Sequence, residues 1–310
     1  MQKILKLKFI NWWSTGHEDF FRKFIENYIG IKTEIVDKNA DILFISVFYK
    51  QSPHEYVKNN PSVKLKIFFT GEDTLSKYSR GNGSDHYYLN FADICLGFKY
   101  IEHPNYIRFP LWLTYINIEK FNMGKSCLPF NKLLNFSPNK TNEFCCLLAN
   151  HDSNNTRTNI VKTLNKYKLI TSGTKIFKNN KDIQCKTLGC GKGEYGKQLF
   201  LNNFKFNICS ESSINPGYVS EKIFECIIGG CIPIYNCKDD VMIEPDILNN
   251  NFIIKYNDNN YDEILKKVID LDSNPELFNK FIKQKPLIEN AYENIIKYYD
   301  RLKNQILEFI

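Results

Sequence analysis

The chain has 310 residues, of which 43% are hydrophobic, 24% charged and 15% aromatic, and its net charge is +7. This length and composition exclude a disordered or fibrous protein and allow one large domain or two of ordinary size. The basic surplus suits a polyanionic ligand such as a nucleotide diphosphate. Because the lysines are scattered and form no basic run, a nucleic-acid partner is not expected.

The sequence carries no sign of export or of a membrane span. Lysines alternate with apolar residues over Met1–Ile10, which is typical of a strand and not of a signal peptide. No apolar run approaches the ~20 residues that a membrane-spanning helix needs. We therefore expect a cytoplasmic protein whose cysteines are reduced.

Metal-ligand spacing is absent from the sequence. Cys185-x4-Cys190 is not followed by a second close pair of Cys or His at the spacing of a zinc site, and the five histidines share no spacing with one another. The run Gly189-x-Gly191-x-Gly193 lacks the lysine of a P-loop and predicts only a loop near a nucleotide. The sequence therefore predicts no metal site.

The first half of the chain alternates strand-like and helix-like segments. Leu5–Phe9 alternates as in a strand, and apolar residues at helical spacing over His17–Ile29 predict a helix that ends at Gly30. Continuous apolar runs, as in strands buried on both faces, follow at Asp41–Phe48, Leu65–Phe69 and Ala92–Phe98. This alternation predicts a parallel sheet covered by helices.

The alternation breaks over Asn117–Asn142, and we place a linker at residues 129–142. It separates an N-terminal domain, residues 1–128, from a C-terminal domain, residues 143–286, which a last helix at 287–310 follows. In the second part, strands are predicted at Phe144–Leu148, Leu169–Ser172, Phe204–Cys209 and Cys231–Tyr235, and helices at Thr156–Tyr167, Tyr195–Asn203, Val219–Ile228, Asp262–Leu271 and Leu287–Ile310. Two tandem Rossmann-like domains that face a cleft fit this layout.

The last predicted helix has one apolar face. Its apolar residues recur at alternating steps of four and three, at Ile288, Tyr292, Ile295, Tyr299, Leu302 and Ile306. We expect this face to pack across the protein's own two domains, with self-association as the alternative.

The segment Phe204–Tyr235 carries the strongest chemical signal. A strand is predicted to end at Cys209, a polar loop with Glu211 follows, and a helix is predicted to begin near Gly217. Ligands of open parallel sheets bind beyond the carboxyl ends of the strands, and helix N-termini favour anions. The loop therefore lies where an anion or a nucleotide is expected.

Residues at the start of this predicted helix have side chains that suit a sugar nucleotide. Glu221 can accept hydrogen bonds from sugar hydroxyls, and Lys222 can pair with a phosphate as a mobile point charge. Tyr218 can stack on a ring or donate its hydroxyl. On spacing alone, the alternative for Glu221 is that it only complements the helix dipole.

Ordered motifs in both halves resemble the α1,3-fucosyltransferase family. Phe206–Glu211, Gly217–Lys222 and Ile232–Tyr235 together resemble the family's donor-site motif. Phe9–Trp13 and Ile67–Glu72 resemble the first strand and the F-[YF]-T-G-E segment of its bacterial members. The resemblance extends over roughly residues 4–240, and the remainder is similar only in style.

The resemblance implies a GT-B fold, with two Rossmann-like domains whose parallel sheets face a central cleft and with the donor in the C-terminal domain. It implies an inverting transfer of L-fucose from GDP-β-L-fucose to a hydroxyl of an oligosaccharide or glycan. The implied linkage is of the α1,3 type, with an N-acetylglucosamine-like acceptor. No cofactor is implied, and a divalent metal is at most stimulatory.

Roles for individual residues follow from the same resemblance. Glu72 matches the general base, and a carboxylate at this place can take the proton of the acceptor hydroxyl as the new bond forms. Arg157 matches an arginine that grips the donor diphosphate, which a planar, always charged fork suits. The implied donor contacts are Arg157, Tyr218, Glu221, Lys222 and Glu211. A carboxylate near the sugar, such as Glu221, also stabilises an oxocarbenium-like transition state.

Two departures from the family pattern leave the donor sugar open. Asn236-Cys237 stand where many members have Trp-Gly, and Ser212-Ser213 where Asn-Ser or Asn-Thr is usual. The alternatives are a transferase for another GDP-linked 6-deoxy sugar and a non-catalytic nucleotide-sugar or glycan-binding protein. A dinucleotide oxidoreductase is disfavoured because the first predicted strand and helix are not joined by G-x-G-x-x-G.

Overall fold

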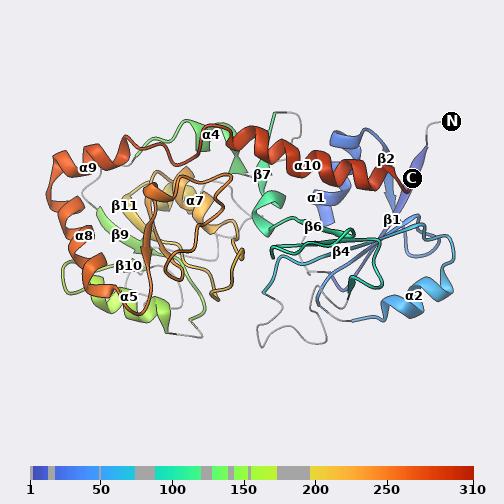
Figure 1. Ribbon diagram of the computed structural model, residues 1–310, viewed down its shortest axis with the longest axis horizontal. Coiled ribbons are helices and arrows are strands. Elements are labelled where there is room, and N and C mark those ends of the chain that lie inside the picture. Colours follow the sequence, from blue (N-terminus) through green and yellow to red (C-terminus); the bar gives the residue numbers. More distant parts are fainter. Residues whose placement is uncertain are drawn as a thin grey trace. The chain divides into compact units, whose positions relative to one another are not determined.

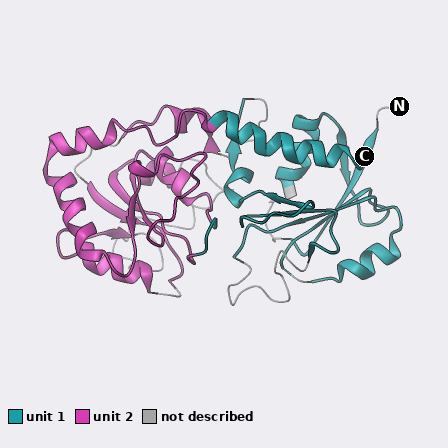
Figure 2. Ribbon diagram, viewed as in Figure 1, with its two compact units in different colours: residues 1–124, 215–218, 292–310 teal, residues 125–214, 219–291 magenta. Residues whose placement is uncertain are grey.

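The computed structural model describes residues 3–12, 18–48, 50–73, 88–119, 128–138, 143–152, 155–172 and 196–310. The chain divides into two compact units, which Figure 2 colours separately. Unit 1 comprises Met1–Gly124, Asn215–Tyr218 and Tyr292–Ile310, and unit 2 comprises Lys125–Ile214 and Val219–Ala291. Each unit contains a parallel sheet of its own.

Unit 1 is built on a six-stranded parallel sheet with the order β2-β1-β3-β4-β5-β6 (Figure 1). Its strands are β1 (Ile4–Ile10), β2 (Lys32–Ile35), β3 (Ile42–Ile45), β4 (Leu65–Phe69), β5 (Ile94–Gly97) and β6 (Tyr106–Arg108). Every residue of β3 and β5 is buried, as continuous apolar runs predict. The predictions for β1, β3, β4 and β5 are confirmed, while β2 and β6 were not predicted.

The helix predicted before Gly30 forms in two parts. α1 (Glu18–Lys23) continues as the π-helix η1 (Phe24–Ile29), and the chain leaves it through Gly30 at φ +89°, a conformation that glycine adopts without strain. Phe21 is fully buried, and its ring centroid lies 5.0 Å from that of Phe44 on β3. Aromatic packing therefore holds this helix against the sheet.

The remaining elements of unit 1 are α2 (Pro53–Asn59), the 3-10 helix η2 (Leu111–Thr114), β7 (Ile116–Asn117) and the part of α10 (Ala291–Leu307) that begins at Tyr292. The apolar face of α10 is buried: Ile295, Tyr299, Leu302 and Ile306 have no exposed surface. The Tyr299 hydroxyl donates to the carbonyl oxygen of Leu113 at 2.7 Å. A helix is confirmed here, but it begins at Ala291 and not at Leu287, so Ile288 lies outside it. Burial of these four side chains inside the protein leaves this face unavailable for self-association.

Unit 2 is built on a five-stranded parallel sheet with the order β10-β9-β11-β12-β13. Its strands are β9 (Glu143–Leu147), β10 (Thr171–Ser172), β11 (Phe204–Ile208), β12 (Ile232–Asn236) and β13 (Ile254–Tyr256), and β8 (Leu128–Pro129) lies outside this sheet. Its helices are α4 (Phe130–Leu134), α5 (Thr156–Leu164), α6 (Gly196–Leu201), α7 (Lys222–Ile228), the 3-10 helix η4 (Asn250–Phe252), α8 (Tyr261–Ser273) and α9 (Pro275–Ile282). The edge strand β13 and the helix α9 were not predicted.

The segment proposed as a linker, residues 129–142, contains a helix. α4 occupies Phe130–Leu134, and its Phe130 and Leu133 side chains are buried. The residues from Lys125 onward group with unit 2. Pro129 and Asn135 bound this short helix, which has an apolar side.

Helix α7 starts later than the sequence predicts. The helical pattern suggested a start at Val219, with Glu221 and Lys222 in the first turn, but the helix begins at Lys222 and Glu221 occupies the cap position. The reason is a buried carboxylate. Glu211 accepts hydrogen bonds from the Ser220 amide at 2.8 Å and from its hydroxyl at 2.7 Å, which holds the preceding backbone outside the helix.

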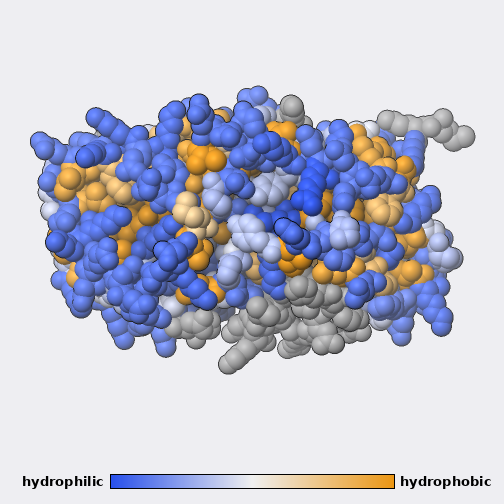
Figure 3. Space-filling view, viewed as in Figure 1, coloured by the Kyte–Doolittle hydropathy of each residue, from blue (hydrophilic) through white to orange (hydrophobic). Residues whose placement is uncertain are grey.

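Hydrophilic residues cover most of the face seen in Figure 3, with smaller hydrophobic patches between them. Large hydrophobic side chains that are more than half exposed include Leu169, Tyr100 and Leu199. Such scattered apolar exposure is normal. Within the described residues, every helix is too short or too polar to cross a membrane.

Candidate functional site

The loop between β11 and α7 is organised around Glu211. Its side chain is 2% exposed, and besides its two bonds to Ser220 it accepts a hydrogen bond from the Lys222 ammonium at 2.9 Å. A buried carboxylate is tolerated only when it is paired and hydrogen-bonded, and here its oxygens receive amide, hydroxyl and ammonium donors. Glu211 therefore fixes the conformation of this loop at the carboxyl end of β11.

Lys222 and Glu221 lie on the more open side of this cluster. The Lys222 ammonium also donates to the Ser220 hydroxyl at 2.7 Å and lies 3.8 Å from a carboxylate oxygen of Glu221. The two side chains are 30% and 17% exposed, so both keep some surface for a ligand. Burial by itself would raise the pKa of Glu221, but the charges of Lys222 and Lys197 outweigh it and hold that pKa below its usual value.

A second ion pair lies beside this cluster. The Lys197 ammonium at the start of α6 pairs with a carboxylate oxygen of Glu225 on α7, and the Glu225 side chain is 4% exposed. The two helices approach closely because Gly229 follows α7: a Cβ there would lie 2.5 Å from the Leu201 Cβ. Close packing thus brings a lysine from α6 near the N-terminal end of α7.

Arg157 lies at the start of α5 and is 4% exposed. Its guanidinium donates to the carbonyl oxygen of Ser210 at 2.6 Å and to that of His151, while its backbone amide donates to Asp152 at 3.2 Å. Its Nε is buried without a partner among the described residues. The guanidinium therefore ties the loop after β9 to the residue before Glu211 and keeps unused N–H donors.

A polar group lies at the carboxyl ends of β12 and β13. The hydroxyls of Ser210 and Tyr256 are 2.7 Å apart, and burial raises the pKa of Tyr256 above its usual value. Asn236 is 5% exposed, and its side-chain amide interacts with the Tyr256 hydroxyl. These polar side chains lie at the edge of the sheet beyond which ligands of open parallel sheets bind.

In unit 1, Glu72 follows the carboxyl end of β4. The Thr70 hydroxyl accepts from the Glu72 amide at 3.2 Å and donates to the Glu72 carbonyl oxygen at 2.9 Å. Gly71 packs so closely that a Cβ there would lie 2.5 Å from the Leu111 Cδ1. The backbone on the N-terminal side of Glu72 is thus held in place, and the side chain is partly exposed.

Tyr218 is placed apart from the residues that follow it. It groups with unit 1, is 7% exposed, and packs edge-on against Phe98 with ring centroids 5.0 Å apart. Unit 2 therefore brings Glu211, Glu221 and Lys222 together, and Arg157 is joined to them through the backbone of Ser210. Glu72 and Tyr218 belong to unit 1.

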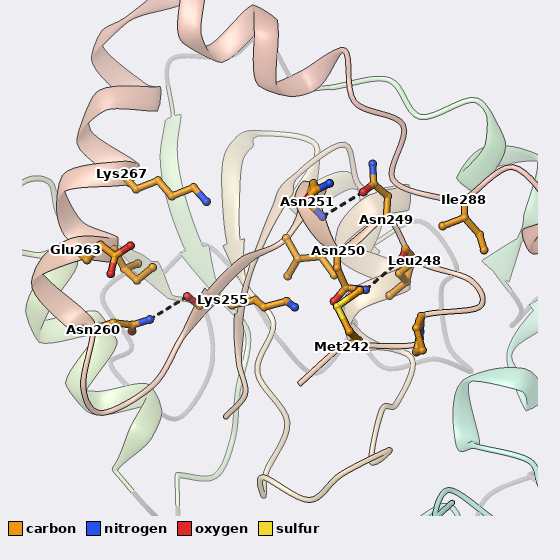
Figure 4. Close-up of a pocket in the computed structure, with 13 residues that line it drawn as sticks. Met242, Leu248, Asn249, Asn250, Asn251, Lys255, Asn260, Glu263, Lys267 and Ile288 are labelled. Atoms are coloured by element: carbon orange, nitrogen blue, oxygen red, sulfur yellow. Dashed lines mark hydrogen bonds between the residues drawn. The ribbon is translucent and has the colours of Figure 1, made fainter. Parts of the chain in front are cut away.

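A pocket of about 400 Å³ opens elsewhere in unit 2 (Figure 4). It lies between the 242–251 segment, β13 and α8, and Lys255 and Lys267 contribute to its lining. The Lys255 ammonium donates to the Val241 carbonyl oxygen at 2.9 Å, and burial lowers the pKa of Lys267. None of the site residues proposed from the sequence lines it.

The described residues bring together no set of metal ligands. In the described ranges, His, Cys, Asp and Glu side chains form no group of three that could hold an ion. Cys185, Cys190 and the Gly189–Gly193 run lie outside the described residues. The positive charges described for the unit 2 cluster belong to Lys197, Lys222 and Arg157.

Two family models match the chain. The model described as the alpha-(1,3)-fucosyltransferase FucT N-terminal domain matches residues 7–115, and the one described as glycosyltransferase family 10 (fucosyltransferase) C-term matches residues 137–299, just over half of the chain. The chain belongs to glycosyltransferase family 10. The family resemblance inferred from the motifs is confirmed.

A curated relative supports the same assignment. The alpha-(1,3)-fucosyltransferase FucT of Helicobacter pylori is 22% identical over 350 aligned positions, which cover 98% of this chain. The chain spans 65% of the length of that relative.

Solved structures show the fold of this family 10 protein. One crystal structure of alpha1,3-fucosyltransferase superposes on this chain with a TM-score of 0.62 at 19% sequence identity. A second, with GDP, gives a TM-score of 0.62 at 18% identity. A third, with GDP-fucose, gives 0.61 at 18% identity. Each match covers 98% of this chain and 91% of the other chain. The predicted GT-B class, an α/β fold with parallel sheets, is confirmed.

Several residues of the unit 2 cluster escaped the sequence analysis of this family 10 protein. Lys197 and Glu225 are paired only because α6 packs on α7, and nothing local in the sequence links them. Tyr256 lies on a strand too short for its pattern to show. Ser220 lies within the Gly217–Lys222 motif, but the motif assigns it no role of its own. The signal that could have found it is the need of a buried glutamate for nearby donors.

Proposed function

We propose that this family 10 protein is an inverting fucosyltransferase that moves L-fucose from GDP-β-L-fucose to a hydroxyl of a sugar acceptor. We propose an oligosaccharide or glycan with an N-acetylglucosamine-like acceptor residue and an α1,3-type linkage. The observation that carries the proposal is the cluster at the carboxyl end of β11, where buried Glu211 holds Lys222 beside the partly exposed carboxylate of Glu221. A cation beside an ionised carboxylate suits a ligand that joins a phosphate to a sugar.

The donor would be held by charges of both signs. We assign Lys222 to a phosphate and Glu221 to sugar hydroxyls, because Glu221 stays ionised and keeps exposed surface. Arg157 is assigned to the diphosphate through its remaining N–H donors. Glu211, proposed from the motif as a donor contact, is better suited to hold Ser220 and Lys222, since its oxygens already accept from both.

The acceptor hydroxyl would lose its proton to Glu72. A general base must come within ~2.6–3.2 Å of the proton donor, directly or through one water. Glu72 has a partly exposed side chain on a backbone held by Thr70, which supports this role. The proposed step is a single displacement: the acceptor oxygen bonds to the anomeric carbon, the bond to GDP breaks, and Lys222 and Arg157 stabilise the departing diphosphate. We propose that no cofactor is needed and that a divalent metal at most stimulates.

A transferase for another GDP-linked 6-deoxy sugar is the second candidate. Asn236 favours it, because a buried amide stands where many family members have tryptophan. An amide can read a hydroxyl pattern that an indole cannot.

One experiment tests both candidates. The purified protein is incubated with GDP-fucose or with other GDP-6-deoxy sugars, each with a panel of glycan acceptors. Mass spectrometry identifies the transferred sugar, and NMR gives its linkage and anomeric configuration. We expect an α-L-fucoside. Transfer of only another sugar would establish the second candidate, and GDP-sugar binding without a product would indicate a non-catalytic binding protein.

A further inference from the structure

A short segment of the donor-site loop belongs structurally to unit 1. Asn215–Tyr218 lie in the chain between Ile214 and Val219 of unit 2, but they group with unit 1 (Figure 2). Within that unit, the Tyr218 ring packs edge-on against Phe98. We call Asn215–Tyr218 the strap.

Gly217 lets the strap pack closely against Phe98 and Arg108. This residue has φ +79°, and a Cβ there would lie 2.4 Å from the Phe98 carbonyl oxygen, so a side chain is excluded both by backbone strain and by contact. The Gly217 carbonyl oxygen accepts from the Arg108 guanidinium at 3.3 Å. Arg108 is itself held, because it donates to the Phe98 carbonyl oxygen at 3.0 Å and stacks 4.4 Å above the Tyr100 ring. Contacts among Phe98, Tyr100 and Arg108 therefore shape the surface on which the strap packs.

The first strap residue contacts the neighbour of Glu72. The Asn215 side-chain amide donates to a carboxylate oxygen of Asp73 at 2.5 Å, and Asp73 is 4% exposed. A hydrogen bond to a charged carboxylate is among the stronger interactions available to an amide. The backbone of Glu72 is therefore held by Thr70 on one side and by Asp73 on the other.

We propose that Asp73 and Asn215 are positioning residues for Glu72, and that the strap links the order of the donor-site loop to the placement of this carboxylate. The inference rests on the proposed role of Glu72 as the base. The strap continues directly toward Glu221 and Lys222, so the segment that holds Asp73 is covalently continuous with the proposed donor contacts. In such an enzyme, Glu72 is correctly placed only when the loop between β11 and α7 is ordered.

A set of charge exchanges tests the bond. Asp73→Asn keeps an oxygen that accepts from Asn215, so its effect should be small. Asn215→Asp places a carboxylate against the buried carboxylate of Asp73, so the bond should be lost. In the double variant Asp73→Asn/Asn215→Asp, the amide at position 73 donates to the carboxylate at position 215 and the bond returns with its polarity reversed. Asn259→Asp, on an exposed loop of unit 2, adds the same charge as a control.

We expect Asn215→Asp to lower kcat about 10- to 100-fold, because displacement of a catalytic group by about 1 Å costs this much. The affinity for GDP, measured by calorimetry, should change by less than about threefold, and the double variant should recover most of the lost rate. Hydrogen exchange of a peptide containing the strap should accelerate in Asn215→Asp and slow again in the double variant. This readout is independent of activity and also shows whether the fold is intact.

The outcomes are distinguishable. An inactive natural sequence with normal strap exchange would overturn the proposed function, and with it the role of the strap in catalysis. An active natural sequence with normal turnover in Asn215→Asp, or with no recovery in the double variant, would overturn the inference alone. A fall in GDP affinity as large as the fall in kcat would also overturn it, because the strap would then act on donor binding and not on Glu72.

Discussion

Two turns that carry glutamate follow the carboxyl ends of parallel strands, one in each unit, and they are held in opposite ways. In unit 2, the Glu211 carboxylate is buried and its oxygens accept from Ser220 and Lys222. In unit 1, the Thr70 hydroxyl binds the backbone of Glu72, and the residue is partly exposed. The first arrangement uses a carboxylate to build a loop, and the second uses a loop to present a carboxylate.

This difference between Glu211 and Glu72 separates glutamates with a structural role from those with a chemical role. A glutamate whose oxygens are buried against protein donors has little left to offer a ligand, whereas a glutamate whose side chain is partly exposed can reach one. Glu221, with 17% of its side chain exposed, belongs with Glu72 in this respect. The following predictions test that division.

The largest effect is expected at Glu72. Glu72→Gln keeps the size of the side chain and removes its basicity, so transfer at saturating donor and acceptor should fall ~10²–10⁴-fold, as is typical when a general base is lost. GDP affinity should stay near normal, because a base contacts the acceptor. Glu55→Gln, on the exposed side of α2, serves as the matched control. Near-normal turnover in Glu72→Gln would assign the base to another residue.

A large effect of another kind is expected at Glu211. Glu211→Gln removes the charge that faces the Lys222 ammonium and should lower the free energy of unfolding by about 1–3 kcal/mol. Chemical denaturation measures this change, and calorimetry should show weaker GDP binding because Ser220 and Lys222 lose their anchor. Glu276→Gln, exposed on α9, is the control. Full stability with selective loss of transfer would instead make Glu211 a ligand contact.

Arg157 should combine both kinds of role. Arg157→Ala removes its hydrogen bonds to the Ser210 and His151 carbonyl oxygens and the charge assigned to the diphosphate. Affinity for GDP and for GDP-fucose should fall alike, by about tenfold or more. Arg157→Lys keeps the charge but not the planar guanidinium, so it should recover only part of the lost affinity. Unchanged calorimetric affinity for GDP in Arg157→Ala would refute the diphosphate role.

The smallest effect is expected at Glu221 and is a difference between ligands. Glu221→Ala should weaken GDP-fucose several-fold, within the ~0.5–1.5 kcal/mol of a typical hydrogen bond, and leave GDP nearly unchanged. Lys222→Ala should weaken both. Equal losses of the two ligands in Glu221→Ala would return Glu221 to a structural role at the helix end.

The pH dependence of this preference follows from the pKa of Glu221. That pKa is lowered in the folded protein, so the carboxylate is ionised above its ordinary titration range and protonates only at lower pH. The ratio of GDP-fucose to GDP affinity should therefore be constant from about pH 5 to 8 and decline only below that range. Competition binding across this range measures it, and a decline near neutral pH would mean that Glu221 is not the group responsible.

The sequence by itself determined the parallel sheets, the family and the apolar face of α10. Continuous apolar runs such as Leu65–Phe69 specify buried strands, and the spacing of Ile295, Tyr299 and Leu302 specifies one helix face, because both patterns are written in neighbouring residues. The motifs also selected Glu72 and Glu221 as chemical candidates. Periodicity could not place the start of α7, because a side chain nine residues away from Ser220 decides it.

Only the tertiary structure decided which of these residues hold the protein together. Glu211 is a loop anchor because it is buried with Ser220 and Lys222, and Tyr218 lies in unit 1 because its ring packs against Phe98, more than a hundred positions earlier. The bond between Asp73 and Asn215 joins positions 142 residues apart. Such pairs leave no local pattern, because burial and hydrogen-bond geometry are set by the packing of distant elements.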